Sequence, residues 1–430
     1  MSAVKKEQVD RHCDDVIIVG AGLTGYLMGL SLAEAGCQTR IIDRGDGSVA
    51  ADAIRTTTIN PASYDFLNSL GVWGSFVKFG PAPTAVQQIR VSDEQTKPKA
   101  GRIVADHLIN WSADENDNPL AWVFQNQQMV KALSALCHDH DKITVTTKTA
   151  ITGYSETDAY FGDTAASVQA EDGTNFPARL IIAADGAKSP LRAKAKLKTI
   201  SRSPGQTAIV ANIKTEKPHE QMAWQRFLNG GPAALMPIDD DCMMSLVWTL
   251  KNEDAATLLN ADANAFNTAL MESFGTGLGA LALTSERLSW SLNLHHVLKP
   301  IATRLVLAGD AAHAIHPLAG QGYNLAVGDA KGLVDIVKKS KLSGRDIGSR
   351  HGLRLYARDR LIETSAMTAM TDGLNAAFSF GGPIVSAAVG MGMTLFGATP
   401  LKSLAHKAAS GKISGGKISG GKIFGEKMGG

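Results

Sequence analysis

The chain has 430 residues and a formal net charge of +2, with 44% hydrophobic and 20% charged residues. This composition argues against a disordered or fibrous protein, and the length favours two packed domains over a single hydrophobic core. Residues 402–430 carry six lysines and one glutamate. The rest of the chain is therefore weakly acidic, which argues against nucleic acid as a partner.

The cysteines lie far apart in the sequence and form no CxxC pair. This spacing argues against a zinc site or a disulfide framework and favours a reducing compartment. The first fifteen residues contain no apolar segment of the kind that secretory signals carry. We therefore expect a cytoplasmic protein, and a peripheral contact with the cytoplasmic face of a membrane stays open. The four cysteines are Cys13, Cys37, Cys137 and Cys242.

Residues 14–44, DDVIIVGAGLTGYLMGLSLAEAGCQTRIIDR, predict a strand, a helix and a second strand. The β-branched run 16–19 favours the first strand, and the apolar run 39–42 favours the second. Between them a glycine-rich turn leads into a helix that ends near Ala35. This order of elements is typical of the start of a nucleotide-binding α/β domain.

The glycine-rich turn of this segment has the GxGxxG spacing of a dinucleotide site. Gly20 permits the tight turn, Gly22 lets the backbone approach a pyrophosphate, and Gly25 lets the helix pack closely on the strand. Asp43 follows the second strand, where a carboxylate can accept hydrogen bonds from both ribose hydroxyls of an adenosine. Together these residues predict that the chain binds a dinucleotide.

Two later stretches place an aspartate after an apolar strand. In ARLIIAADGAKSPLRAKAKL, Asp185-Gly186 follows the predicted strand 180–183, and Ser189 and Arg192 fall on the next helical turn. In LVLAGDAAHAIHPLAGQGYNLA, Gly309-Asp310 follows the predicted strand 305–308. An aspartate after one strand is often only a turn former or a helix cap. With the GxGxxG stretch, whose second strand is followed by Asp43, there are three such segments, and their order along the chain forms a pattern.

The pattern resembles the flavoprotein aromatic hydroxylases of the p-hydroxybenzoate hydroxylase fold, and among them the ubiquinone-biosynthesis hydroxylases. The likeness runs from about Asp15 to about Leu401 and includes the stretches IRTTTINPASYDFLNSLGVW, FQNQQMVKAL and PHEQMAWQRFLNGGPAALMPI. It implies that FAD is the cofactor and that NAD(P)H is a transient electron donor. In this family the GxGxxG segment holds the ADP part of FAD, the DG segment is associated with both FAD and NAD(P)H, and the GD segment binds the ribityl-phosphate side.

The resemblance implies the following set of cofactor-binding residues. They are Gly20, Gly22, Leu23, Thr24, Gly25, Asp43, Arg44, Arg55, Gln127, Asp185, Gly186, Arg192, Gly309, Asp310, Pro317, Gly320, Gly322, Tyr323 and Asn324. We assign His316, Pro317, Gly320 and Gln321 to the catalytic wall beside the isoalloxazine ring.

The residue types of this wall suit a flat ring. Pro317 has a fixed φ and no N–H, so it can form a rigid surface without leaving an unpaired donor. Gly320 and Gly322 let the backbone pass close to the ring. A helix that begins near Tyr323 would point its positive end at the flavin, where negative charge collects on reduction.

The histidines near this segment do not form a catalytic or metal-binding pattern. Pro317 disfavours a helix, so His313 and His316 need not share one face, and no carboxylate is placed by sequence to orient either of them. A packing role beside the flavin is therefore favoured over proton transfer. His295-His296 lacks partners at ligand spacing, so we expect a structural role and no metal site.

The reaction implied by the resemblance is hydroxylation of the aromatic ring of a polyprenylated phenol in ubiquinone biosynthesis, through a flavin C4a-hydroperoxide formed with O₂. Two alternatives share the same FAD segments. One is an FAD-dependent reductase of prenyl double bonds, and the other is a non-catalytic FAD-binding scaffold of a biosynthetic complex. A homo-oligomer also stays open.

The expected architecture is α/β, a Rossmann-like FAD-binding domain with a mixed β-sheet substrate domain and C-terminal helices. We expect the FAD domain in three pieces, 1–80, 100–190 and 295–345, and the substrate domain at 191–294. A C-terminal helical region, 346–401, would cover them. The charge-free run from Gly373 to Leu401 suits a buried cap or an apolar surface that touches membrane or an oily substrate, and the Lys/Gly-rich tail 402–430 would be flexible.

Overall fold

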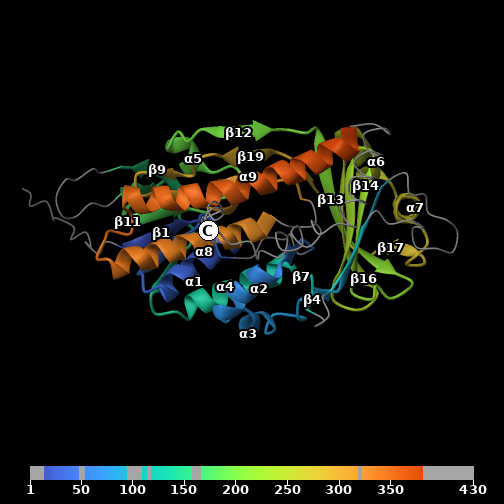
Figure 1. Ribbon diagram of the computed structural model, residues 1–430, viewed down its shortest axis with the longest axis horizontal. Helices are drawn as coiled ribbons and strands as arrows, with labels where there is room; N and C mark the ends of the chain where they lie inside the picture. The colour runs from blue at the N-terminus through green and yellow to red at the C-terminus, as the bar shows by residue number, and fades with distance from the viewer. Residues whose placement is uncertain are drawn as a thin grey trace, which may run out of the picture.

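The computed structural model describes residues 14–47, 54–93, 109–113, 118–156, 166–317 and 322–380. Two large sheets dominate these residues (Figure 1). The first sheet and its helices occupy the left of the view, and the second sheet stands at the right, with α6 and α7 on its outer side. The Lys/Gly-rich tail lies outside the described residues, as does the run from 381 to 401.

The first sheet has eight strands in the order β20-β21-β11-β1-β2-β8, with β10 paired to β11 and β9 paired to β10. The strands β21, β11, β1, β2 and β8 are parallel to their neighbours, while β20 and β10 are antiparallel to theirs. The bounds are β1 Asp14–Val19, β2 Thr39–Ile42, β8 Ile143–Thr146, β9 Ile151–Ser155, β10 Ala166–Ala170, β11 Asn175–Ala183, β20 Ile301–Ala302 and β21 Leu305–Leu307.

The central parallel strands β1, β11 and β21 are largely buried, which explains their continuous apolar runs, whereas the edge strand β8 is not buried. In β1, Val16 and Ile18 belong to one hydrophobic core, and Ile17 and Val19 belong to another. This alternation follows from the two-residue period of a strand. The predicted strands 16–19, 39–42, 180–183 and 305–308 are confirmed. The first begins two residues earlier than predicted, the third begins five residues earlier, and the last ends one residue earlier.

Helices cover one face of this sheet. The core beneath them joins residues of α1 Leu23–Glu34, α4 Asn126–His138 and α8 Gly322–Leu342. The long helix α9 Arg350–Phe380 packs on α8 and continues toward the second sheet, where it contacts β14 and β15 (Figure 1). The short helices are α2 Pro61–Ser69, α3 Val72–Phe76 and α5 Pro190–Lys194.

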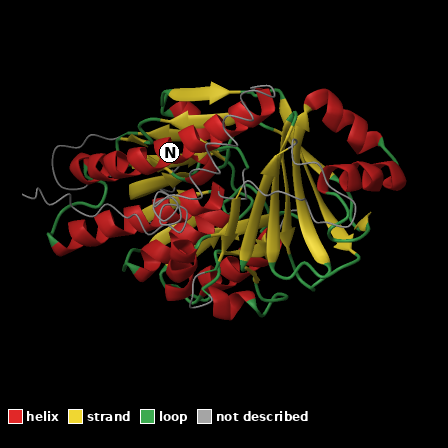
Figure 2. Cartoon of the chain, turned by 45° about the vertical axis from the view of Figure 1, so that its right-hand side comes forward, coloured by secondary structure: helices red, strands yellow, loops and turns green. Residues whose placement is uncertain are grey.

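The strands of the second sheet stand side by side in the right half of Figure 2. This sheet is mostly antiparallel and has the order β17-β13-β16-β15-β14-β5-β6, with β18 paired to β13. Its outer face packs on two helices, α6 Asn252–Asn260 and α7 Ala263–Phe274. The strands are β5 Gln88–Asp93, β6 Ile109–Ser112, β13 Gln206–Thr215, β14 Met222–Leu228, β15 Gly231–Pro237, β16 Met243–Lys251, β17 Leu281–Leu283 and β18 Leu288–Ser291.

Two small three-stranded sheets complete the described part of the chain. One has the order β3-β7-β4 and the other β12-β19-β22. Their strands are β3 Thr56–Ile59, β4 Thr84–Val86, β7 Ala121–Gln125, β12 Thr199–Arg202, β19 Leu294–Val297 and β22 His313–Ala314. A 3-10 helix, Gly309–Ala311, lies between β21 and β22.

Strand β3 connects the helical part of the protein to the second sheet. The hydroxyl oxygens of Thr56 and Ser245 lie 2.7 Å apart, and the Thr58 hydroxyl donates to the Met236 sulfur at 3.2 Å. Both partners of β3 are on the inner face of the second sheet, opposite to α6 and α7.

The proposed division into domains stays a prediction, with one structural qualification. Strands β5 and β6 are hydrogen-bonded into the second sheet, through a parallel pairing of β5 with β14. Residues 109–112, which we placed in the FAD domain, are therefore part of the sheet that holds β13 and β16. Among the described residues, no helix is long and apolar enough to cross a membrane.

Candidate functional site

The predicted cofactor segments meet at one edge of the first sheet. Strands β21, β11, β1 and β2 are parallel neighbours, so the residues that follow them lie side by side. Ala184 N donates to Val19 O at 2.8 Å, and Ala308 N donates to Ala183 O at 3.0 Å. In open α/β sheets the edge at the carboxyl ends of the strands is where ligands bind.

The glycine-rich segment after β1 has two crowded glycines and one open glycine. A Cβ on Gly20 would lie 2.3 Å from Ala184 O, and a Cβ on Gly25 would lie 1.7 Å from Gly20 O. Gly20 also has a φ of +110°, which side chains other than glycine rarely adopt. At Gly22, by contrast, an added Cβ would meet nothing within 4 Å. The backbone at Gly22 is therefore accessible from outside the protein.

Helix α1 begins immediately after Gly22 and has no side-chain cap. The N–H groups of its first turn lack intrahelical partners, as in any helix, and they carry the positive end of the helix dipole. An uncapped N-terminus beside an open glycine fits an anion such as a pyrophosphate.

Asp43 lies after β2 at the same edge. Its Oδ2 accepts from Ala21 N at 2.7 Å, and its Oδ1 accepts from Gly45 N at 2.6 Å. These bonds fix the carboxylate beside the glycine-rich turn, and each oxygen retains a second lone pair for a ligand. Arg44, the next residue, is exposed.

The segment after β11 is held by its own helical turn. Ser189 caps α5 by accepting from Arg192 N at 2.9 Å, and Leu191 N donates to Asp185 Oδ2 at 3.2 Å. Asp185 Oδ1 is buried and has no hydrogen-bond partner among the described residues. Burial raises the pKa of this carboxyl above its usual value. Gly186 has a φ of +83°, and a Cβ there would meet no atom within 4 Å.

Arg192 joins this segment to the one after β21. Its Nη1 donates to Ala311 O at 2.9 Å and lies 3.0 Å from His295 Nε2. The same imidazole nitrogen lies 2.9 Å from Asp310 O. Burial, followed by the charge of Arg192, lowers the pKa of His295. The structural role expected for His295 agrees with these contacts.

Gly309 packs against the glycine-rich segment. With a φ of +56°, it would place a Cβ 2.5 Å from Thr24 Oγ1, so a larger residue cannot fit. Asp310 is exposed at this edge, whereas Ala311 and Ala312 are buried. Because Ala311 and Ala312 are small and buried, the exposed carboxylate of Asp310 is the group of this segment that a ligand would contact.

A carboxylate that we did not anticipate orients His313. Asp329 Oδ2 lies 2.8 Å from His313 Nε2, and both side chains are buried. The expectation that no carboxylate orients either histidine is thus wrong for His313, because α8 folds back over β22. A signal was present, since Asp329 interrupts an otherwise apolar helix face.

His316 is completely buried, and neither ring nitrogen has a partner within the described part of the chain. Burial and the nearby Arg202 lower the pKa of His316 to about 4, so the ring is neutral near pH 7. Pro317 is half-buried beside it. Gly320 and Gln321, the other two residues of the predicted catalytic wall, lie outside the described residues, as do Leu318 and Ala319.

The start of α8 is tied to two other elements. Tyr323 is buried and its hydroxyl donates to Leu23 O at 3.5 Å. Asn324 accepts from Asn60 N and donates to Thr58 O, both at 3.0 Å. The amide of Asn324 therefore binds the protein's own backbone. Helix α8 begins at Gly322, within one residue of the predicted start.

The remaining predicted residues lie where α4 and β3 approach each other. Asn126 N donates to Arg55 O at 2.8 Å, and the Arg55 guanidinium lies over the Trp290 ring, 4.9 Å from its centroid. Gln127 is half-buried in the first turn of α4. The neighbouring Asn126 Oδ1 is buried with no described partner. This amide oxygen at the start of α4 is a further candidate contact for the cofactor.

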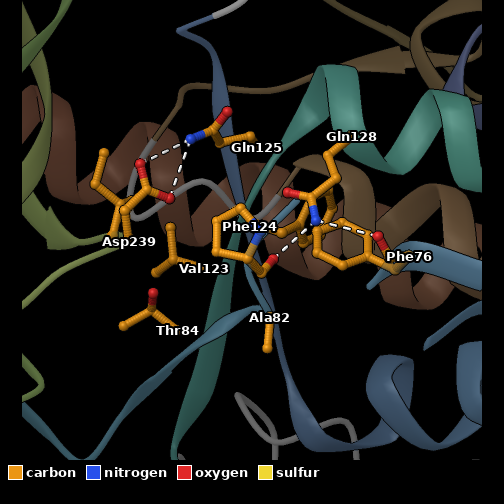
Figure 3. Close-up of a pocket in the computed structure, with 10 residues that line it drawn as sticks. Phe76, Ala82, Thr84, Val123, Phe124, Gln125, Gln128 and Asp239 are labelled. Carbon is orange, nitrogen blue, oxygen red and sulfur yellow. Dashed lines mark hydrogen bonds between the residues drawn. The ribbon is translucent and has the colours of Figure 1, made fainter. Parts of the chain in front are cut away.

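A small pocket lies between the β3-β7-β4 sheet and the second sheet (Figure 3). Its wall residue Phe124 lies 6.1 Å from Tyr323, centroid to centroid, and edge-on to it. The Gln125 amide donates to both carboxylate oxygens of Asp239 at 3.1 and 2.9 Å. The pocket is lined by Phe76, Pro81, Ala82, Thr84, Val123, Phe124, Gln125, Gln128, Ile238 and Asp239.

The residues at the sheet edge fit an FAD. They offer an open glycine at an uncapped helix start, two accessible carboxylates at Asp43 and Asp310, and one buried carboxylate oxygen without a described partner at Asp185. This is the donor and acceptor set that an adenosine ribose, a pyrophosphate and a ribityl chain require. Among the described residues, no group of three or more His, Cys, Asp or Glu side chains could hold a metal ion.

Two solved structures have a similar fold. The p-nitrophenol 4-monooxygenase PnpA from Pseudomonas putida matches with a TM-score of 0.73 and 16% identity, over 93% of this chain and 98% of that one. PqsL from Pseudomonas aeruginosa, a probable FAD-dependent monooxygenase, matches with a TM-score of 0.72 and 18% identity, over 86% and 97%. These likenesses show the fold of this chain, which is of the p-hydroxybenzoate hydroxylase type.

Comparisons of sequence show the family to which the chain belongs. The FAD binding domain family matches residues 14–370, and the chain belongs to this family of FAD-binding monooxygenases. It is 30% identical to the ubiquinone hydroxylase UbiL of Rhodospirillum rubrum, over 85% of this chain and 82% of the relative. It is 29% identical to the ubiquinone biosynthesis monooxygenase COQ6 of Mus musculus and 27% identical to the 3-demethoxyubiquinol 3-hydroxylase of Escherichia coli. Both matches cover 85% of this chain, and 84% and 90% of the relatives.

Proposed function

We propose that this monooxygenase hydroxylates the aromatic ring of a polyprenylated phenol in ubiquinone biosynthesis. The observation that carries the proposal is the meeting of the glycine-rich, Asp185 and Gly309-Asp310 segments at one sheet edge. The names of the relatives, which are ubiquinone hydroxylases from bacteria and animals, support the choice of substrate class.

We assign the cofactor contacts by chemistry. The open backbone at Gly22 and the start of α1 would hold the pyrophosphate, Asp43 the adenosine ribose, and Asp310 the ribityl hydroxyls. A bound FAD that has received two electrons would supply the oxygen-transfer chemistry, in which one atom of O₂ enters an electron-rich ring and the other leaves as water. The electrons would come from transiently bound NAD(P)H or from a separate donor protein.

The protein's own contribution is positioning and exclusion of water. Neutral, fully buried His316 and the rigid Pro317 would form a dry wall beside the reacting ring. Buried Tyr323 and Phe124 close the side toward β7. In this arrangement no described side chain is placed as a nucleophile, and none is needed, because the cofactor carries the difficult step.

The Figure 3 pocket has a volume of only about 10 Å³, which is room for a water molecule and not for an aromatic ring. We therefore do not assign the substrate to this pocket. We propose a lipophilic phenol and O₂ as the partners, with peripheral membrane contact and assembly into a complex or homo-oligomer left to experiment.

The test is turnover by the purified protein reconstituted with FAD. NADPH oxidation is followed in air, with and without a short-chain prenylphenol, and the product is analysed by mass spectrometry. The proposal predicts that the phenol accelerates NADPH oxidation and becomes one oxygen atom heavier. A prenyl reductase would instead work without oxygen and add two hydrogens. A scaffold would bind FAD but turn over neither compound.

A further inference from the structure

A buried carboxylate on α8 connects the cofactor edge to α9. Asp329 is 2% exposed, and it lies in the middle of a helix face whose other residues form the main hydrophobic core. Burial of a charge is costly unless it is paired and hydrogen-bonded. The contacts of Asp329 must therefore compensate for the cost of burying its charge.

Three groups from three different elements bind this carboxylate. Oδ2 accepts from Gly309 N at 2.9 Å and from His313 Nε2 at 2.8 Å, and Oδ1 accepts from Arg360 Nε at 2.8 Å. Gly309 belongs to the predicted ribityl segment, His313 to β22 and Arg360 to α9. Asp329 thus binds the turn after β21 from the protein interior, whereas Asp310 of the same turn is exposed.

Arg360 is fitted closely to α8. It is 6% exposed, its Nη2 donates to Leu325 O at 3.1 Å, and its Nη1 pairs with Glu363. A Cβ on Gly328 would lie 2.8 Å from Arg360 Nη1, so the glycine provides the room for this side chain. The guanidinium therefore fixes the position of α9 on α8 as well as the charge of Asp329.

Asp329 and Arg360 each stabilise the ionised form of the other. Although burial raises the pKa of the Asp329 carboxyl, His313 and Arg360 reverse this effect and hold the pKa below its usual value. Burial likewise lowers the pKa of Arg360, but Asp329 and Glu363 raise it to a value above the usual one. Both groups are therefore ionised near neutral pH. Loss of Arg360 would leave Asp329 with His313 and Gly309 N alone, and loss of Asp329 would leave Arg360 with Glu363 as its acidic partner.

We propose that Asp329 and Arg360 are positioning residues that couple the docking of α9 to the binding of FAD. Asp329 sets the orientation of the Gly309-Asp310 segment through Gly309 N, and Arg360 brings the position of α9 into the same network. A buried ion pair contributes little net stability compared with apolar residues of similar volume, and the role we assign to this one is to specify a single geometry. The proposal rests on the proposed function only in placing FAD at Gly309-Asp310.

The coupling must act in both directions. If the correct docking of α9 favours FAD binding, then FAD binding favours the docked state of α9 by the same factor, which is typically about 5- to 150-fold. Helix α9 also contacts β14 and β15 of the second sheet. A helix that responds to the cofactor therefore reaches the sheet on which we expect the substrate.

The experiment measures FAD affinity and hydrogen exchange in the same proteins. Apo-protein is titrated with FAD, and binding is followed by the quenching of flavin fluorescence. Arg360→Met and Asp329→Asn are compared with Arg358→Met, a matched control on the same helix whose side chain is 69% exposed. We expect the dissociation constant of FAD to rise about tenfold or more in the first two variants and to stay within about twofold in the control.

Hydrogen exchange tests the coupling without any substitution. In the wild-type protein, FAD should slow the exchange of the backbone amides of residues 356–364, although we place none of them in contact with the cofactor. In Arg360→Met this protection should be lost, while protection of residues 20–25 persists once FAD is saturating.

Each outcome decides the proposal. Equal FAD affinity in wild-type and Arg360→Met, or wild-type exchange in α9 that FAD does not change, overturns the coupling while leaving the flavoprotein intact. A variant that unfolds more easily but binds FAD normally assigns the network a purely structural role. Wild-type protein that binds no FAD overturns both this inference and the proposed function.

Discussion

At the scale of single residues, the glycines of the GxGxxG segment have separable roles. Gly25→Ala would force a Cβ to within 1.7 Å of Gly20 O, so we expect it to lower the free energy of unfolding by about 3 kcal/mol or more. Gly22→Ala adds a methyl group that meets no protein atom, and its φ of −87° is compatible with alanine. We expect the Gly22→Ala apo-protein to keep wild-type stability but to bind FAD about tenfold more weakly.

Urea unfolding of the two apo-proteins and an FAD titration check this contrast. Because the two glycines are three residues apart on the same turn, each serves as the control for the other. Unchanged FAD affinity in Gly22→Ala would contradict the placement of the pyrophosphate at this backbone.

His316 makes stability depend on pH. Its pKa is lowered from 6.5 to about 4 in the folded protein, so between these values the unfolded chain binds a proton that the folded chain does not. The contribution of His316 to the free energy of unfolding is therefore fully present above about pH 6.5 and is lost as the pH decreases toward 4. For this residue alone we expect a loss of about 2 kcal/mol between about pH 7.5 and pH 5.

The comparison of wild type with His316→Gln isolates this contribution, because burial also lowers the pKa of His219, His295 and His296. The free energy of unfolding in urea is measured at both pH values. The wild-type protein should lose more stability on acidification than the variant does. An equal loss in both would mean that His316 is accessible to protons in the folded state.

The residues that sequence reasoning found are those whose signal is local. Gly20, Asp185 and Gly309 each lie within two residues of the end of an apolar strand, so their place at the sheet edge follows from the strand that precedes them. Asp329 and Arg360 were not found, because their contacts join residues 16 to 31 positions apart through the packing of α8 and α9. Their only sequence signal was a charge on an apolar helix face.

At the scale of elements, β3 fixes how the second sheet meets the rest of the protein. The Thr56–Ser245 hydroxyl contact spans the two parts, and Ser245 is fully buried. Removal of one partner would leave the other without its hydrogen bond in a dry environment. We expect a double-mutant cycle of Thr56→Val and Ser245→Ala to give a coupling energy of about 1 kcal/mol.

A matched control lies in the first sheet. The hydroxyls of Ser155 and Ser167 are also 2.7 Å apart, but they are exposed, so water can replace either partner. Their alanine cycle should give a coupling near zero. If the buried pair couples no more strongly than the exposed pair, β3 does not hold the two parts together through this contact.

Elements were easier to predict than their partners. The strand-helix-strand order of residues 14–44 follows from hydrophobic periodicity and glycine placement, and it agrees with β1, α1 and β2. The membership of β5 and β6 in the second sheet was missed, because strands from distant parts of a chain pair through register and topology that no local pattern records.

At the scale of the whole molecule, the arrangement explains how a two-sheet protein can perform oxygen transfer. The parallel sheet presents backbone N–H groups and carboxylates at one edge, and the start of α8 and strand β7 bring the buried rings of Tyr323 and Phe124 together. The polar edge suits the cofactor, and buried apolar rings suit a reaction that water would divert. Helix α9 contacts both α8 and the second sheet, and Arg360 fixes it to α8.

The most direct test of the central claim is an oxygen-isotope measurement on the FAD-loaded protein. A prenylphenol is turned over with NADPH under ¹⁸O₂, and the product is examined by mass spectrometry. The account predicts that each product molecule carries one oxygen atom from O₂, with NADPH consumed in step. A product without new oxygen, or with oxygen derived from water, would contradict it.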